Sequence, residues 1–302
     1  MKYVEVGGAR MSAIGLGTWQ FGSREWGYGS GYARGEAVKI VHRALDLGVT
    51  LIDTAEIYAF GQSERIVGEA IRGRRDEVFL ATKLFPIGLP VQVGAKARAS
   101  ARRLGVERID LYQQHWPSPM FPPAATMPRM RKLAESGLVA HVGVSNHSLA
   151  QWQAAEAAFG SAVLSNQVRF NVLDRGPERE LLPWAQANGR VVIAYSPLAQ
   201  GLLTGRYQDA APRNFRRFNP AFRAAARAKL KPLLAAMSEI ASHHQATTSQ
   251  VALAWLLRKP NVVVIPGASS VQQLEQNVAA ADVELSDEDD AMLGALAAGL
   301  QA

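Results

Sequence analysis

Two short apolar runs carry the first information about the fold: Val49-Thr-Leu-Ile-Asp53 and Val78-Phe-Leu-Ala-Thr-Lys83. A segment of helical period, residues 63–71, lies between them. Both runs are apolar along most of their length, which is typical of parallel strands that are covered on both faces. A strand, a helix and a second strand in this order predict a βαβ unit within a parallel sheet.

The same alternation continues outward in both directions along the chain. Further strands are predicted at residues 13–16, 109–115, 140–145, 163–168, 191–195 and 262–266. Helices are predicted at residues 36–47, 63–71, 91–104, 125–136, 149–159, 178–188, 230–257 and 272–278, with a last one from residue 287. Eight strands, each followed by a helix, predict an α/β fold of the closed parallel (β/α)8 TIM-barrel type.

A doubly wound dinucleotide-binding sheet is the main alternative to the barrel. Its fingerprint is G-x-G-x-x-G after the first strand and directly before a helix. The glycine-rich segment Gly15-Leu-Gly17-Thr-Trp-Gln-Phe-Gly22 has the wrong spacing and no helix behind it. We find no repeat or linker, and therefore predict one domain over residues 1–302. Two long connections, residues 21–34 and 199–229, are predicted to be binding loops.

The composition restricts the class of protein. Of the 302 residues 48% are hydrophobic and 20% charged, which is enough to bury a large core. The absence of cysteine excludes disulfides, thiolate nucleophiles and cysteine-based metal sites, and it fits a reducing compartment. Because Glu5, Gly7 and Gly8 lie where a signal peptide needs an apolar core, we expect no signal peptide, and no apolar run is long enough to cross a bilayer. We therefore expect a cytoplasmic protein with no membrane partner.

The net charge of +7 raises the question of nucleic-acid binding. The arginines are scattered along helix-like segments, and aromatic residues do not alternate with them as in a base-stacking surface. A denser basic run spans residues 213–223. We interpret the charge as solvated surface with room for a phosphate site, and we expect no nucleic-acid partner.

Ionisable residues fall at the ends of three neighbouring strands. The second strand ends at Asp53, with Tyr58 five residues further on, and the next two strands end at Lys83 and His115. In barrel enzymes the reactive residues cluster at the C-terminal ends of the strands. Each residue alone also has an ordinary explanation, such as a helix cap or a solvated strand end. The four together predict one catalytic group.

These four residue types are suited to protonating an alkoxide. A free tyrosine has a pKa of about 10 and is a weak acid at neutral pH. An adjacent lysine ammonium favours the phenolate and lowers the tyrosine pKa, and an aspartate keeps the lysine charged. A neutral histidine beside the phenol can donate a hydrogen bond to a substrate carbonyl. We therefore predict that Tyr58 is the proton donor.

The chain also resembles a known family in several segments. Residues 48–68 contain Asp53-Thr-Ala-Glu-Ile-Tyr58 and Gly61-Gln-Ser-Glu64, and this region is similar to the aldo-keto reductase signature. Further matches are Ala-Thr-Lys83, Gln-Gln-His115-Trp, Gly143-Val-Ser-Asn-His, Ser165-Asn-Gln-Val, Ala194-Tyr-Ser-Pro-Leu and Ile265-Pro-Gly-Ala. The resemblance covers essentially the whole chain. It points to the microbial branch related to the potassium-channel β subunits.

The resemblance implies an NADP-dependent oxidoreductase that binds an extended NADPH on a barrel. It places the nicotinamide carboxamide at Ser145, Asn146 and Gln167, and the face of the nicotinamide ring against Tyr195. It places the pyrophosphate along Ser196, Leu198 and Gly201. Side-chain amides match the donors and acceptors of a carboxamide, and an aromatic face gives a flat ring an apolar support.

The adenosine end departs from the family pattern. Many members have a lysine and an arginine for the 2′-phosphate where this chain has Gly267 and Gln273, with Ser269 and Asn277 nearby. The replacement cations are expected from the long basic loop, at Arg206, Arg213, Arg216 or Arg217, because an arginine fork suits phosphate geometry. NADPH is the predicted cofactor, and NADH remains open.

The substrate is expected to be a small-molecule carbonyl compound. Related steroid double-bond reductases have glutamate where this chain has His115, so the resemblance implies reduction of an aldehyde or ketone. The aromatic residues Trp19, Trp26 and Trp116 are predicted to line the substrate pocket, and Tyr28, Phe121 and Phe170 also follow strand ends or lie in loops. The substrate, the oligomeric state and the direction of reaction stay open.

Two alternatives from other classes remain. The resemblance to channel β subunits permits an NADP-binding regulatory or redox-sensing subunit with slow turnover. A metal-dependent barrel enzyme that uses Asp53 and His115 is the second. It is disfavoured because no H-x-H motif follows the first strand and no other histidines form a ligand set, so no metal is predicted.

Overall fold

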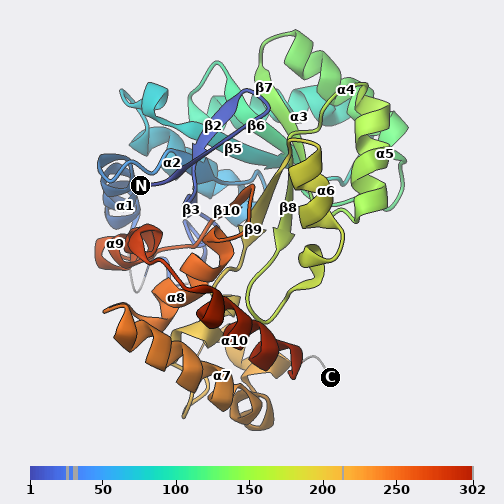
Figure 1. The fold of residues 1–302 in the computed structure, drawn as a ribbon. Helices are drawn as coiled ribbons and strands as arrows, with labels where there is room; N and C mark the ends of the chain where they lie inside the picture. Colours follow the sequence, from blue (N-terminus) through green and yellow to red (C-terminus); the bar gives the residue numbers. More distant parts are fainter. Residues whose placement is uncertain (25–26, 30–32, 213, 301–302) are drawn as a thin grey trace.

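The computed structural model describes residues 1–24, 27–29, 33–212 and 214–300. Its main sheet has eight parallel strands that follow one another in chain order (Figure 1). They are Leu16–Gly17 (β3), Leu51–Asp53 (β4), Phe79–Leu84 (β5), Ile109–Gln114 (β6), Val139–Ser145 (β7), Ser165–Arg169 (β8), Val191–Tyr195 (β9) and Val262–Val264 (β10). Each of these strands lies close to a predicted one.

The first and last strands meet, so the sheet is closed. Parallel bridges join Ile14 to Val264 and Gly17 to Gly267, and the Gly15 N–H donates to the Val264 carbonyl over 2.7 Å. This contact needs glycine at position 17, because a Cβ atom there would lie 2.7 Å from the Ile265 carbonyl oxygen. The predicted (β/α)8 barrel is confirmed.

Helices surround the sheet and bury apolar side chains against it (Figure 1). They are Arg34–Asp46 (α1), Gln62–Ala70 (α2), Val93–Leu104 (α3), Pro123–Glu135 (α4), Leu149–Phe159 (α5), Leu181–Ala187 (α6), Ala224–His243 (α7), Thr248–Leu257 (α8), Val271–Val278 (α9) and Asp287–Ala298 (α10). The last helix, α10, packs against α7.

An antiparallel hairpin that the sequence analysis missed precedes the barrel. Strands β1 (Tyr3–Val6) and β2 (Ala9–Ser12) are joined by Gly7 and Gly8, both with positive φ. Val6 and Met11 pack in one cluster with barrel residues such as Leu51. The signal was the Gly-Gly pair, a common two-residue hairpin turn. The hairpin fills the N-terminal end of the barrel and leaves the C-terminal end for the site.

Two sequence predictions need correction. The single helix predicted over residues 230–257 is two helices, because the chain turns at Gln245, with φ of 51°, and Thr247 caps α8 through the backbone N–H of Gln250. The loop predicted over residues 199–229 contains 3-10 turns at Ala199–Thr204, Phe215–Phe218 and Pro220–Phe222, followed by the first turn of α7. Short hydrogen-bonded turns of this kind lack the apolar period that identifies longer helices.

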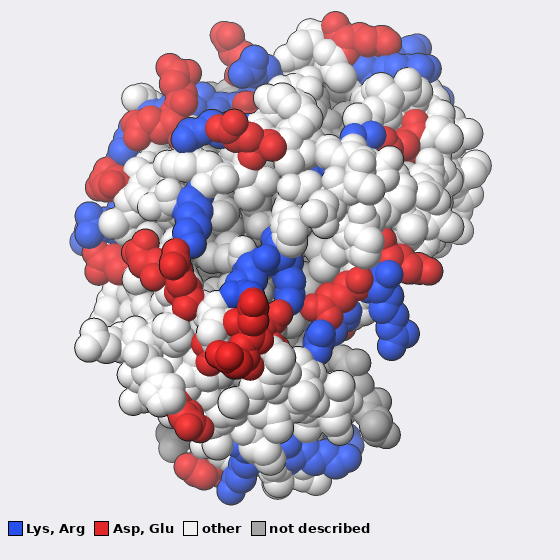
Figure 2. Space-filling view, viewed as in Figure 1, with Lys and Arg blue, Asp and Glu red and all other residues white. Residues whose placement is uncertain are grey.

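Charges of both signs are mixed over the face of the molecule seen in Figure 2. On this face no continuous basic surface is seen among the described residues. Within the described residues, no helix combines the length and the apolar character that a membrane span requires.

Candidate active site

A cleft of about 960 Å³ opens at the C-terminal ends of the strands. It is lined by the residues that end β3, β4, β7, β8 and β9 and by the loops that follow them. Of the four predicted catalytic residues, Asp53, Tyr58 and His115 line the cleft, and Lys83 lies buried behind Asp53 and Tyr58. The barrel therefore brings together side chains that are up to 62 residues apart in the sequence.

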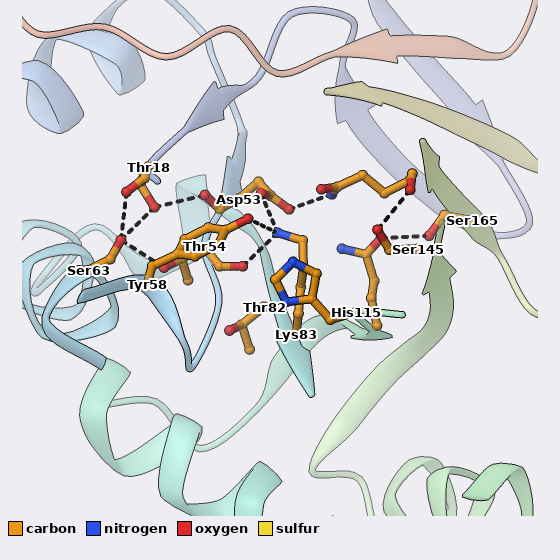
Figure 3. A network of polar contacts seen from close by, with 12 residues as sticks. Thr18, Asp53, Thr54, Tyr58, Ser63, Thr82, Lys83, His115, Ser145 and Ser165 are labelled. Atoms are coloured by element: carbon orange, nitrogen blue, oxygen red, sulfur yellow. Dashed lines mark hydrogen bonds and ion pairs between the residues drawn. The ribbon is translucent and has the colours of Figure 1, made fainter. Parts of the chain in front are cut away.

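Lys83 is the centre of this group (Figure 3). Its Nζ donates to Asp53 Oδ2 over 2.6 Å, to the Thr54 carbonyl over 2.9 Å and to the Tyr58 hydroxyl over 3.2 Å. The Lys83 side chain is fully buried and Asp53 is 2% exposed. An ammonium has three N–H groups, so these three bonds satisfy it completely. A buried charge of this kind is tolerated only with such pairing.

The charges in the site decide which form each group takes. Burial would lower the pKa of Lys83, but Asp53 and Tyr58 outweigh burial and raise it, so the ammonium is retained. Burial raises the pKa of Tyr58, Lys83 lowers it, and Asp53 raises it again, so the pKa of Tyr58 lies above its usual value. The lowering by Lys83 was predicted from the sequence, whereas the larger effect of burial was not. Without a bound cofactor, the phenol is therefore firmly protonated.

His115 is held as a neutral ring. Burial and the charge on Lys83 lower its pKa to about 3. The ring packs edge-on against Tyr58, with centroids 5.8 Å apart, and stacks on Trp116 at 6.2 Å. Its Nδ1 is buried and has no hydrogen-bond partner among the described residues. A neutral imidazole in this place can donate one N–H to a substrate oxygen, as the sequence analysis expected.

A network of hydroxyl groups holds the segment that carries Tyr58 (Figure 3). Ser63, in the first turn of α2, lies 2.8 Å from the Thr18 hydroxyl and 3.0 Å from the Thr54 hydroxyl. Thr18 also donates to the Asp53 carbonyl over 2.8 Å. These bonds fasten the chain on both sides of Tyr58 to the barrel, which limits the movement of the phenol.

The two residues after Tyr58 adopt an unusual backbone conformation. Ala59 and Phe60 have φ of 46° and 55°, in the left-handed region that non-glycine residues seldom occupy. The Phe60 ring is 96% exposed and lines the cleft. Phe60 was not predicted as a site residue, because an aromatic residue in a turn carries no periodic signal in the sequence.

The residues predicted to hold the carboxamide lie together near the C-terminal ends of β7 and β8. Asn146 has φ of 60°, which turns its side chain so that Nδ2 donates to the His115 carbonyl, and the Tyr195 hydroxyl donates to Asn146 Oδ1 over 2.9 Å. The Ser145 hydroxyl donates to the Gln167 carbonyl over 2.8 Å. The Gln167 amide donates to Asp53 Oδ1 over 2.7 Å, a contact that the sequence did not suggest.

Most of the predicted phosphate and adenosine contacts also line the cleft: Ser196, Leu198, Gly201, Gly267, Ser269 and Gln273. Asn277 does not, because its buried side chain donates to the Gly267 carbonyl and supports that loop from behind. Arg206 and Arg217 lie outside the lining, each over a neighbouring aromatic ring. Arg216 lines the cleft, where its Nη1 donates to the Gln200 carbonyl and to the Tyr207 hydroxyl. Arg213 lies outside the described residues.

Aromatic side chains frame the mouth of the cleft beside Tyr58 and His115. Trp19, 48% exposed, stacks on Tyr58 with centroids 6.2 Å apart, and Trp116 is 45% exposed. Trp26 lies outside the described residues. Phe170 is fully buried against Trp255 and cannot reach the cleft, and neither Tyr28 nor Phe121 lines it.

The lining also contains residues that the sequence analysis did not single out. Among them are Gln20, Ile57, Phe85 and Arg169. Gln20 donates to the Gly17 and Ala268 carbonyls, and a Cβ atom at Gly267 would lie 2.8 Å from its Oε1. Gln20 therefore occupies the space beside Gly267.

Comparisons with known proteins agree with this geometry. The sequence profile of the Aldo/keto reductase family matches residues 13–298, and the chain belongs to that family. It is 54% identical to an uncharacterised oxidoreductase of Mycobacterium tuberculosis over 95% of this chain and 90% of the relative. It is 36% identical to a methylglyoxal reductase of Escherichia coli over 95% of this chain and 91% of the relative.

A solved structure supports the same assignment. The aldo/keto reductase of Klebsiella pneumoniae, in complex with NADP and acetate, is 35% identical to this chain. Its structure matches with a TM-score of 0.79 and covers 98% of this chain and 95% of that one. The family and the barrel are therefore established together.

Proposed function

We propose that this protein is an NADPH-dependent oxidoreductase that reduces an aldehyde or ketone to the alcohol, with Tyr58 as the proton donor. The observation that carries the proposal is the buried chain Asp53–Lys83–Tyr58, which ends at the wall of a cleft lined by amide and aromatic side chains. Oxidoreductases among the relatives, and the Klebsiella structure with NADP, support the same class of reaction.

The residues of the cleft fit a nicotinamide cofactor. Asn146 and Gln167 offer amide donors and acceptors, and the half-buried Tyr195 ring offers an apolar face beside them. When bound, the reduced nicotinamide supplies a hydride to the carbonyl carbon. Ser145, Asn146 and Gln167 would hold its carboxamide, and Tyr195 would support one face of its ring.

Tyr58 and His115 would handle the substrate oxygen. The neutral His115 ring donates a hydrogen bond that orients the carbonyl, and Tyr58 gives its proton to the oxygen as the alkoxide forms. The product is an alcohol, with one hydride on carbon and one proton on oxygen. Lys83, 3.2 Å from the phenolic oxygen, stabilises the phenolate that remains until solvent reprotonates it.

The preference for NADPH rests on fewer residues than the catalytic step. Gly267 and Gln273 stand where the resemblance implies a lysine and an arginine in many members, and they line the cleft without offering a positive charge to a 2′-phosphate. Among the described arginines of the predicted set, Arg216 lines the cleft, and its guanidinium suits a phosphate.

The regulatory alternative has no specific observation in its favour. The metal alternative conflicts with the use of both Asp53 oxygens by Lys83 and Gln167.

The direct test is to titrate the purified protein with NADPH and with NADH, following the quenching of tryptophan fluorescence. Aldehydes and ketones are then screened by the loss of reduced-cofactor absorbance. We expect tighter binding of NADPH and carbonyl-dependent oxidation of the cofactor. Binding of neither nucleotide, or cofactor oxidation that does not depend on the carbonyl compound, would contradict the proposal.

A further inference from the structure

The hydrogen bond between Gln167 and Asp53 crosses the top of the barrel. Gln167 belongs to β8 and Asp53 ends β4, and three strands separate them in the sheet. The Gln167 Nε2 atom lies 2.7 Å from Asp53 Oδ1, and both residues are 2% exposed. Hydrogen bonds to a charged group in such surroundings are strong and costly to lose.

This bond gives the second oxygen of the Asp53 carboxylate a hydrogen-bond donor. Lys83 uses Oδ2 and Gln167 uses Oδ1, so within the described part of the chain each oxygen has its own side-chain donor. The three N–H groups of Lys83 are already occupied by Asp53, Thr54 and Tyr58. Lys83 therefore has no spare donor with which to hold the second oxygen. Gln167 fixes the orientation of the carboxylate, and the carboxylate fixes the ammonium.

The position of Gln167 is fixed by two residues that are predicted to bind the cofactor. Its backbone carbonyl accepts the Ser145 hydroxyl over 2.8 Å and the Asn146 N–H over 2.9 Å. A primary amide has two N–H groups and one carbonyl oxygen. Asp53 takes one N–H, which leaves the second N–H and the oxygen for a group in the cleft that Gln167 lines.

We propose that Gln167 is a positioning residue that couples the cofactor carboxamide, through Asp53 and Lys83, to the proton donor Tyr58. The inference rests on the proposed function. It assigns to Gln167 a second role beside cofactor contact: the amide that senses the carboxamide also holds the carboxylate on which the charge at Lys83 depends. Binding of the cofactor and the ability of Tyr58 to donate its proton are then linked.

The test compares Gln167→Leu with Gln153→Leu. The first leucine keeps approximate size and removes the amide that holds Asp53, whereas Gln153→Leu makes the same change at an exposed position of α5 outside the cleft. Gln167→Leu is expected to raise the cofactor Kd in fluorescence titrations. At saturating cofactor it is also expected to lower kcat by about tenfold and to shift the pH midpoint of kcat by roughly half a unit or more, whereas Gln153→Leu should match the wild type.

A second measurement needs no cofactor. Unfolding by urea is followed for Gln167→Leu, Asp53→Ala and the double variant, which gives the coupling between the two side chains. Non-additive effects are expected, because each single variant breaks the same buried contact. Additive effects would show that the contact does not hold Asp53, and would overturn the inference.

The inference would also be wrong if Gln167→Leu raised only the cofactor Kd and left kcat and its pH midpoint as in the wild type. Gln167 would then be a cofactor contact alone. A failure of the proposed function looks different, because the wild-type protein itself would bind no nicotinamide cofactor. The two failures are therefore distinguished by the wild-type titration.

Discussion

Lys83 donates a hydrogen bond to the phenolic oxygen of Tyr58 over 3.2 Å, at the end of a fully buried side chain. The same ammonium lies 2.6 Å from Asp53, so the charge that stabilises a phenolate is itself stabilised from behind. This relationship explains why a lysine is tolerated inside the barrel. Both the stability of the fold and the proposed proton transfer therefore depend on Asp53, Lys83 and Tyr58. Substitutions that change one property and not the other can distinguish the two roles.

Lys83→Met is expected to abolish carbonyl reduction and to destabilise the fold. Removing one partner of a buried ion pair leaves an unpaired charge, at a cost of about 3–5 kcal/mol. The double variant Lys83→Met/Asp53→Asn removes both charges and should recover most of this loss without recovering activity. Urea unfolding and initial rates measure the two effects. A double variant no more stable than Lys83→Met would contradict the pairing.

His115 is expected to make the protein sensitive to acid. Its pKa is lowered to about 3, whereas an unfolded histidine titrates near 6.5, so the unfolded chain binds a proton first as the pH falls. The contribution of the neutral ring is complete above pH ~6.5 and is lost as the pH falls toward ~3. At pH 4.5 the loss amounts to about 3 kcal/mol.

His115→Gln should therefore lose less stability than the wild type between pH 7 and pH 4.5. Thermal melts at the two pH values measure the difference. A His243→Gln variant, which removes an exposed histidine at the end of α7, serves as the control. Equal acid sensitivity of His115→Gln and the wild type would contradict the burial of a neutral ring at this position.

The left-handed backbone at Ala59 predicts a stabilising substitution. A non-glycine residue in this region costs roughly 1–2 kcal/mol, and glycine pays about 0.5–1 kcal/mol in chain entropy. Ala59→Gly is therefore expected to stabilise the protein by about 0.5–1 kcal/mol, measured by urea unfolding. Ala225→Gly, early in α7, is the matched change and should destabilise. Loss of stability in Ala59→Gly would show that φ at this residue is not positive in solution.

Substitutions at Arg216 and Arg206 test whether the basic loop binds the cofactor phosphate or is only basic surface. Arg216 lines the cleft and Arg206 does not. Arg216→Ala is expected to weaken NADPH binding by about tenfold or more, because a charged hydrogen bond contributes ~1.5–3 kcal/mol, and to weaken NADH binding less. Arg206→Ala should leave both affinities close to those of the wild type. Equal losses for the two nucleotides in Arg216→Ala would place Arg216 away from the 2′-phosphate.

Sequence patterns predicted the barrel because they follow from local chemistry. Buried parallel strands are apolar along their length, and their C-terminal ends must lie at one end of the barrel. The positions of Asp53, Lys83 and His115 at strand ends were therefore enough to predict that these residues lie close together. The catalytic roles of these residues remain predictions.

Long-range contacts and burial were not readable from the sequence. The hydrogen bond between Gln167 and Asp53 joins residues that are 114 positions apart, and neither local sequence predicts it. The raised pKa of Tyr58 depends on how much of the phenol is buried, which only the fold determines. Arg206 and Asn277 were placed in the cleft by their position along the chain, whereas the path of the loop and the bond to Gly267 place them elsewhere.

The central claim is that the Tyr58 hydroxyl supplies the proton, and Tyr58→Phe tests it most directly. The cofactor Kd should stay within about twofold of the wild type, because the phenol does not hold the cofactor in this account. Single-turnover reduction of an aldehyde should fall by about 10²–10⁴-fold, the usual contribution of a positioned acid. Tyr3→Phe, which removes a hydroxyl bonded to the Gly48 carbonyl outside the cleft, is the control. Reduction by Tyr58→Phe at close to the wild-type rate would contradict the account.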